Sequence, residues 1–131
     1  MDLTYAGPFV EHLGLRLDEV SGGRVVASWT AGERHHQPYG IVHGGVHASV
    51  VETLGSVGSA AWAGAHLAEG TKVVGVHNST DFFRAVSTGD LTSTAVPVHQ
   101  GRSQQVWVVE TRDDQDRLVA RGQLRVHNLG P

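Results

Sequence analysis

Glu52 stands in a part of the sequence where a carboxylate could act on an acyl group. It lies in a stretch with helical spacing, and Ser56 follows one turn later, about 40° away around a helix of 100° per residue. The other residues predicted on that side, Ala48 and Ser59, are small. A carboxylate beside a hydroxyl on such a face could serve as a nucleophile or as a general base.

The start of the same helix offers a place for an oxyanion. His43 is followed by Gly44 and Gly45, and the first N–H groups of a helix have no partner within it and carry partial positive charge. Glycine at both positions would let a ligand reach these groups without a Cβ in the way. The sequence therefore places a base or nucleophile about two turns from an oxyanion site, an arrangement suited to acyl transfer.

One long helix must position these groups. Spacing predicts that it runs from Gly44 to about His66, and that its apolar stripe lies opposite Glu52. The residues of that stripe are Val46, Val50, Leu54, Val57 and Ala61.

Apolar and polar residues alternate on both sides of this helix, which predicts strands. A short helix at residues 8–13 and two strands near 13–17 and 25–29 come first, with a hairpin at 21–23 and a loop at 31–42. Strands at 72–83, 91–99, 103–111 and 118–126 follow, joined by hairpins, and Pro97 marks an edge or a bulge. The prediction is an α+β fold, with a curled antiparallel sheet wrapped around one central helix.

The composition excludes several classes of function. The chain has 131 residues, no cysteine and a net charge of -3, so disulfides, thiolate metal sites and a broad nucleic-acid surface are not expected. No apolar run approaches the roughly 20 residues of a membrane span, and the first residues lack the features of a signal peptide. We expect one domain over residues 1–131, located in the cytoplasm.

Nine histidines raise the question of a metal site. His43 and His47 have the i, i+4 spacing that can share a metal on a helix. However, Gly44 stands where the H-E-x-x-H motif has its glutamate, and no third ligand is evident. We therefore predict no metal.

The chain resembles the hotdog-fold thioesterases of the 4-hydroxybenzoyl-CoA type whose catalytic acid is Glu, the PaaI-like group. It is also similar to thioesterases that act on 1,4-dihydroxy-2-naphthoyl-CoA and on aryl carrier-protein thioesters. The resemblance covers roughly residues 36–127. The residues that carry it are Gln37, His43-Gly44-Gly45, Glu52, Ser56, Val73–Val76, Arg84, Gly89, His99–Ser103 and Gln105–Trp107.

This resemblance implies a role for each residue of the catalytic group. Glu52 attacks the thioester carbonyl or activates a water that does, and the N–H of Gly44 polarises that carbonyl. Gln37 points its amide at the thioester. His43 orients the site and helps the thiolate leave, while Ser56 holds the water or steadies Glu52.

The resemblance also implies a substrate and an assembly. Coenzyme A is part of the substrate, so no separate cofactor is expected, and its nucleotide would meet Arg84, Gly101, Arg102 and Ser103. The acyl group would be aromatic, with 1,4-dihydroxy-2-naphthoyl as the most specific expectation. Each site would be shared between the subunits of a homodimer, and two dimers would form a tetramer.

Two alternatives remain open at this stage. One is a dehydratase or hydratase acting on acyl thioesters with the same fold, which would pair a histidine with an acid to move a proton beside the carbonyl. The other is a protein that binds acyl-CoA without catalysis. Such a protein would keep the pocket but would not need Glu52.

Overall fold

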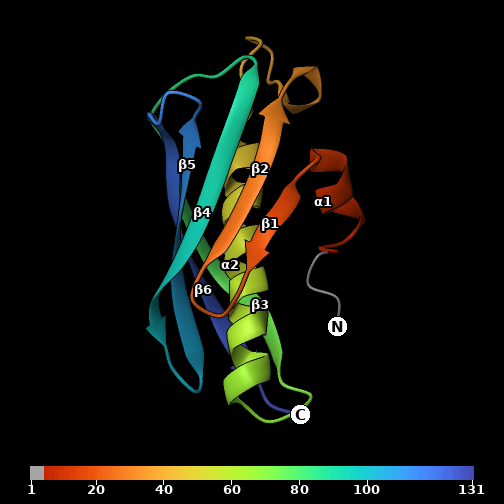
Figure 1. Ribbon diagram of the computed structural model, residues 1–131, viewed down its shortest axis with the longest axis vertical. Coiled ribbons are helices and arrows are strands. Elements are labelled where there is room, and N and C mark those ends of the chain that lie inside the picture. Colours follow the sequence, from red (N-terminus) through yellow and green to blue (C-terminus); the bar gives the residue numbers. More distant parts are fainter. Residues whose placement is uncertain (1–4) are drawn as a thin grey trace.

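The computed structural model describes residues 5–131, in which one long helix packs against a curled antiparallel sheet of six strands (Figure 1). The helices are α1 (Pro8–Leu13) and α2 (Gly44–His66), with a 3-10 helix at Glu33–His35. The strands are β1 (Arg16–Val20), β2 (Val25–Ala31), β3 (Lys72–Phe82), β4 (Gly89–Gln100), β5 (Gln104–Asp113) and β6 (Leu118–Leu129). This confirms the predicted α+β class and the bounds of the long helix.

The alternation before the long helix assigned one residue wrongly. The short helix predicted at residues 8–13 is confirmed as α1. Leu13, which the alternation had also placed at the start of the first strand, is the last residue of this helix and its only buried one. Gly14 then ends α1 with φ 73°, a conformation that glycine adopts without strain. The strand consequently begins at Arg16, and the predicted hairpin joins it to β2.

The buried face of α2 is shifted around the helix from the predicted stripe. Val51 is buried while Val46 is only half-buried, because the sheet wraps around one side of the helix. Two glycines let large side chains approach: a Cβ at Gly55 would lie 2.6 Å from Leu124, and one at Gly58 would lie 2.5 Å from the ring of Trp107. Close packing therefore explains the glycines in the middle of this helix.

The sequence predicted that Ser59 shares a face of the helix with Glu52, and this prediction is wrong. Ser59 is fully buried, and its hydroxyl donates to the carbonyl of Gly55 at 2.7 Å. Its own carbonyl accepts from the side-chain amide of Gln105 at 3.1 Å. Gln105 of β5 therefore covers this position of the helix.

The strand order is β1-β2-β4-β5-β6-β3, which corrects the prediction that hairpins join all the later strands. β3 pairs with β6 at one edge of the sheet, so residues 83–88 must cross to reach β4. The N–H of Val42 donates to the carbonyl of Val86 at 2.8 Å and ties this crossover to the loop before α2. Alternation specifies which side of a strand is buried but not which strand it pairs with.

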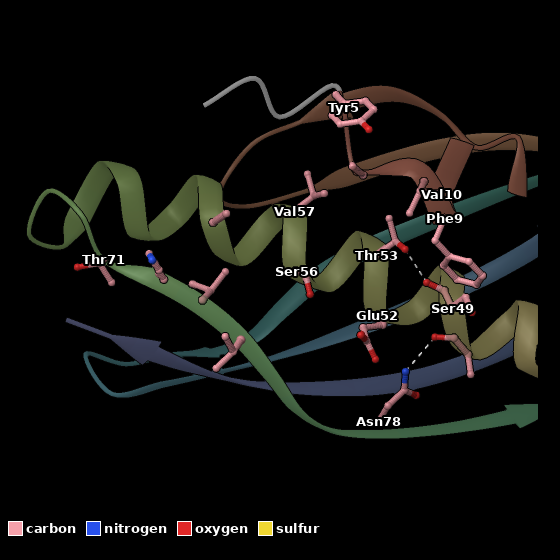
Figure 2. Close-up of a pocket in the computed structure, with 16 residues that line it drawn as sticks. Tyr5, Phe9, Val10, Ser49, Glu52, Thr53, Ser56, Val57, Thr71 and Asn78 are labelled. Atoms are coloured by element: carbon pink, nitrogen blue, oxygen red, sulfur yellow. Dashed lines mark hydrogen bonds between the residues drawn. The ribbon is translucent and has the colours of Figure 1, made fainter. Parts of the chain in front are cut away.

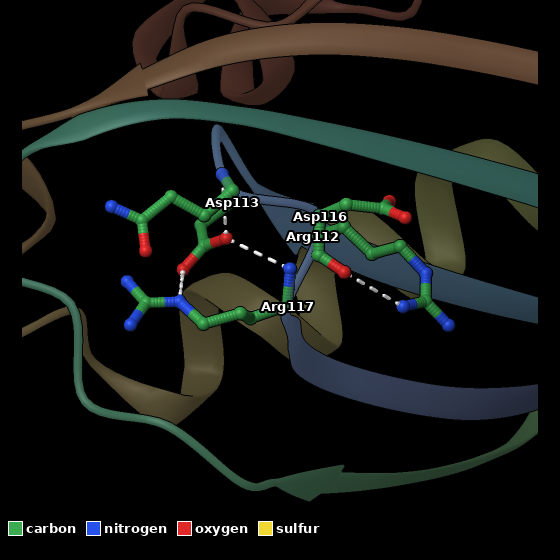
Figure 3. A network of polar contacts seen from close by, with 5 residues as sticks. Arg112, Asp113, Asp116 and Arg117 are labelled. Atoms are coloured by element: carbon green, nitrogen blue, oxygen red, sulfur yellow. Dashed lines mark hydrogen bonds and ion pairs between the residues drawn. The ribbon is translucent and has the colours of Figure 1, made fainter.

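The later strands confirm the prediction for Pro97, and they show how the turn after β5 is held. The pairing of β4 with β5 shifts between Pro97 and His99, so Pro97 lies at a bulge. The polar turn after β5 is organised by Asp113, whose carboxylate accepts from the backbone N–H of Arg117 at 2.9 Å and from its guanidinium at 2.8 Å (Figure 3). These bonds, led by the backbone N–H, lower the pKa of the Asp113 carboxyl below its usual value.

Within residues 5–131, no helix combines the length and the apolar character that crossing a membrane requires.

Candidate active site

A cavity of about 760 Å³ runs along the exposed side of α2 (Figure 2). Its volume is in the range of pockets that hold small organic ligands. Glu52 and Ser56 lie in it together, with the N-terminal segment on one side and the start of β3 on the other. The residues that line these two sides include Tyr5, Phe9, Val10, Thr71, Val73, Val74 and Asn78.

The carboxylate of Glu52 is available for chemistry. The side chain is exposed and lies over Gly75 of β3, where an added Cβ would be 3.9 Å from the carboxyl carbon. Among residues 5–131 it has neither a hydrogen-bond partner nor an ion-pair partner. The carboxylate thus lies at the edge of an apolar cavity with no ion pair from residues 5–131.

Asn78 faces Glu52 from β3 and was missed by the sequence analysis (Figure 2). Its amide donates to the carbonyl of Ala48 at 2.9 Å, and its oxygen accepts from Thr80. Since Ala48 lies one turn before Glu52, this bond fixes β3 against the helix beside the carboxylate. The signal was present in the sequence, because asparagine is depleted in strands.

Ser56 differs from the other hydroxyl residues of α2. Ser49, Thr53 and Ser59 each donate to the carbonyl four residues earlier at 2.7 Å. The Ser56 hydroxyl makes no such bond within the described part of the chain, and it lines the cavity one turn after Glu52. It can therefore bond to a water or to Glu52.

At the start of α2, His43 is the N-cap. Its Nδ1 accepts from the N–H of Gly45 at 2.8 Å, so the proton of the neutral ring lies on Nε2. The N–H of Gly44 has no partner among residues 5–131. One free backbone donor therefore remains at the positive end of the helix.

The two glycines here have a cause that the sequence analysis did not foresee. A Cβ at Gly44 would lie 2.5 Å from the ring of Phe82, and a Cβ at Gly45 would lie 2.9 Å from Nδ1 of His43. A side chain at either position would thus displace a neighbouring ring, whether or not a ligand approaches. Phe82, at the end of β3, thus lies beside the start of α2.

Gln37 lies in the loop before α2, with its side chain turned onto that loop. Its side-chain oxygen accepts from the N–H of Tyr39, and its backbone bonds to Gly40 and Ile41. It does not line the cavity that contains Glu52. In this chain the amide oxygen is therefore engaged locally.

The predicted catalytic residues form two separate groups in one chain. Gly44 and Glu52 are eight residues apart, which is about 12 Å along a helix. A donor that stabilises an oxyanion must lie about 3 Å from it. One group contains Gln37, His43 and Gly44, and the other contains Glu52 and Ser56. Within a single chain the two groups therefore cannot contact the same carbonyl.

Behind the helix start lies a pair of buried histidines. His47 is 3% exposed and His35 is 2% exposed. Burial, with a smaller contribution from His35, lowers the pKa of His47 to about 4, so its ring is neutral at pH 7. No cluster of three metal-ligating side chains occurs within residues 5–131. The pair packs around Trp29, whose ring centroid lies 5.2 Å from that of His35 and 6.0 Å from that of His47.

The predicted nucleotide-binding residues lie at opposite ends of the sheet (Figure 1). Arg84 is exposed just after β3, in the segment that crosses to β4. Gly101, Arg102 and Ser103 form the turn at the other end of β4. Asn128 holds that turn against β6, since its amide donates to the carbonyl of Gly101 at 2.8 Å. One nucleotide cannot contact both places in a single chain.

Known proteins are similar to this chain in sequence and in fold. The pattern of the thioesterase superfamily matches residues 39–120. The chain is 33% identical to the proofreading thioesterase EntH of Cronobacter turicensis, over 99% of this chain and 92% of that protein. The crystal structure of S. sahachiroi AziG superposes with a TM-score of 0.91 at 50% identity, covering 97% of this chain and all of that one. Thioesterase HI1161 of Haemophilus influenzae gives 0.85 at 30% identity, covering 95% and 85%.

These likenesses favour hydrolysis over the two alternatives left open by the sequence. A carboxylate with no partner in the described chain, beside a free hydroxyl in an apolar cavity, is the arrangement expected of a hydrolase acting on acyl groups. Relatives over nearly the whole chain are named thioesterases. The chain belongs to the thioesterase superfamily, with the hotdog fold, and is a thioester hydrolase.

Proposed function

We propose that this thioester hydrolase acts on acyl-CoA substrates with an aromatic acyl group, as a member of the PaaI-like group, and that Glu52 is its catalytic carboxylate. The observation that carries the proposal is the position of Glu52. Its carboxylate has no partner among residues 5–131 and borders a cavity that is otherwise mainly apolar. An apolar acyl group would fill the cavity and bring its thioester to the carboxylate.

Two routes satisfy this geometry. In one, a carboxylate oxygen of Glu52 bonds to the thioester carbon and the C–S bond breaks. The thiolate then takes a proton from water, and a second water hydrolyses the mixed anhydride. In the other route, Glu52 removes a proton from a water whose oxygen attacks the carbon directly; the C–S bond breaks, and the thiolate takes the proton back from Glu52. Ser56 would hold the water in both routes, and both yield the free acid and the thiol.

The separation of Gly44 from Glu52 supports a site shared by two chains. If two α2 helices lie antiparallel about a two-fold axis, Gly44 of one meets Glu52 of the other when the axis passes near residue 48, midway between them. That residue is Ala48, whose small side chain permits close approach. The partner would then supply His43 and Gln37 as well, and both groups of catalytic residues would meet on one carbonyl.

The edge of the sheet supports the same homodimer. β3 pairs only with β6, so its other edge has no partner within residues 5–131. Val74 and Val76 on it are 42% and 43% exposed, and Phe82 is 57% exposed. A long apolar edge is normally covered or paired in proteins. Pairing of two β3 edges would satisfy this requirement, and we propose that two such dimers form a tetramer.

The same antiparallel arrangement would unite the nucleotide-binding residues. It brings the Arg84 end of one chain beside the end of the partner that carries Gly101, Arg102 and Ser103. The turn at 101–103 lies beside β6, the strand next to β3, because Asn128 of β6 bonds to it. Arginine at both places suits phosphate recognition.

The absence of cysteine is compatible with a reducing compartment, and the cytoplasm is our proposed location.

The test is a substrate panel run with the wild-type protein and with Glu52→Gln. The panel contains benzoyl-CoA, 1,4-dihydroxy-2-naphthoyl-CoA, octanoyl-CoA and benzoyl-pantetheine. We expect the variant to lose at least about 10²–10⁴-fold in kcat on every substrate while its thermal melt stays unchanged, since it removes only the reactive charge.

Each part of the proposal can fail separately. Hydrolysis by Glu52→Gln at the wild-type rate would refute the catalytic assignment. A wild-type preference for octanoyl-CoA would refute the aromatic substrate. Equal kcat/KM on benzoyl-CoA and benzoyl-pantetheine would refute recognition of the nucleotide by the arginines.

A further inference from the structure

α1 has an unusual distribution of apolar residues. Only Leu13, its last residue, is buried, whereas Phe9 is 61% exposed and Tyr5, just before the helix, is 55% exposed. Large aromatic side chains normally bury most of their area in a folded protein. Both nevertheless line the cavity that contains Glu52, on the side opposite β3 (Figure 2).

The loop before α2 fixes the position of this short helix. The guanidinium of Arg34 donates to the carbonyl of His12 at 3.1 Å, and Nε2 of His35 bonds to the carbonyl of Leu13 at 2.8 Å. These bonds satisfy carbonyls at the C-terminal end of α1, where helices lack internal donors. α1 is thus anchored at one end, and its other end extends over the cavity.

The part of α2 beneath α1 borders the cavity. Ser49, Thr53 and Val57 face the cavity there, and the hydroxyls of Ser49 and Thr53 are already bonded within the helix. These hydroxyls therefore present little unsatisfied polarity. Glu52 lies around the helix toward β3, so the cavity has a reactive end at Glu52 and an apolar end beneath Phe9 and Tyr5.

We propose that α1 and Tyr5 form the acyl-recognition wall of the enzyme, with Phe9 as the residue that selects bulky aromatic acyl groups. This deepens the proposed function and rests on it. The thioester lies at Glu52, and the ring extends across α2 to pack against Phe9. Exposure of the two aromatic side chains in the free protein is then explained, because the acyl group of the substrate covers them.

The experiment compares 2-naphthoyl-CoA with acetyl-CoA, whose acyl group is too short to reach α1. Phe9→Ala should lower kcat/KM for 2-naphthoyl-CoA about tenfold, since an apolar contact of this size is lost, and leave acetyl-CoA unchanged. Phe9→Trp should retain the wild-type preference. Glu11→Ala, on the same helix but outside the cavity lining, is the matched control and should change neither substrate.

The outcomes separate this proposal from the one it rests on. Equal losses on both substrates, or no loss on either, would overturn the role of Phe9 even if Glu52→Gln abolishes both activities. A change in sedimentation without a change in acyl selectivity would show that a second copy of the chain covers Phe9 instead. Persistent activity of Glu52→Gln would refute the proposed function itself.

Discussion

Most polar groups on α2 are bonded within the chain, and the exceptions, apart from the buried Nδ1 of His47, are groups that the proposed reaction needs. His43 occupies the N–H of Gly45 but leaves that of Gly44 without a partner among residues 5–131. Ser49 and Thr53 bond to the helix, whereas the Ser56 hydroxyl does not within the same residues. At the scale of single residues, free donors and acceptors therefore indicate function better than residue type does.

Two substitutions at Gly44 can test whether its free N–H stabilises the oxyanion. Proline is well tolerated at the first position of a helix but has no N–H, while alanine adds a Cβ and keeps the donor. Both variants must displace the ring of Phe82. We expect Gly44→Pro to lose about 10²–10³-fold in kcat relative to Gly44→Ala, the usual effect of removing one oxyanion donor.

Steady-state kinetics on benzoyl-CoA with both variants gives this ratio, and circular dichroism confirms that each is folded. Equal kcat values for Gly44→Pro and Gly44→Ala would show that the N–H of Gly44 does not stabilise the oxyanion.

At the scale of elements, the first turn of α2 depends on a neutral histidine. His47 is buried, and its Nδ1 has no hydrogen-bond partner among residues 5–131. Its ring packs against Phe82 with centroids 5.9 Å apart. The pKa of His47 is lowered from 6.5 to about 4 by burial and by His35. The unfolded chain therefore binds a proton here at a higher pH than the folded chain does.

The free energy of unfolding should consequently fall as the pH drops from 6.5 toward 4. His47 contributes its full stability above pH 6.5, and the loss at low pH is roughly 3 kcal/mol at most. Urea unfolding at pH 7.0, 6.0, 5.0 and 4.5 measures this dependence. His47→Leu should show a shallower decline with pH, and an identical decline in both proteins would contradict the assignment.

At the scale of the whole molecule, a shared site predicts that two inactive variants can restore each other. A dimer of one Glu52→Gln chain and one Gly44→Pro chain would contain one site with both groups intact and one with both removed. Random mixing gives half mixed dimers, so about a quarter of the wild-type activity should return after the variants are unfolded and refolded together.

Each variant refolded alone provides the baseline, and mixing without unfolding controls for additive residual activity. A co-refolded sample no more active than the sum of its parts would place each site within one chain. It would also remove the argument for antiparallel α2 helices.

The sequence by itself determined the elements and the type of reaction. Helical and strand periodicities are local, so the bounds of α2 and the run of strands could be predicted from the sequence. Pro97 likewise predicted the bulge at which it lies. The resemblance to the family rested on the spacing of His43, Gly44 and Glu52 together with the sequence blocks of the later strands. The roles of these residues, by contrast, remain predictions.

Only the tertiary structure decided which of these elements meet. β3 pairs with β6 rather than β4, Ser59 is buried by the curling sheet, and Phe82 packs on Gly44. The tertiary structure also places Phe9 over the cavity of Glu52, although the two residues are 43 positions apart in the sequence. Periodicity states which side of an element is buried, but its neighbours depend on long-range packing, which no local pattern encodes.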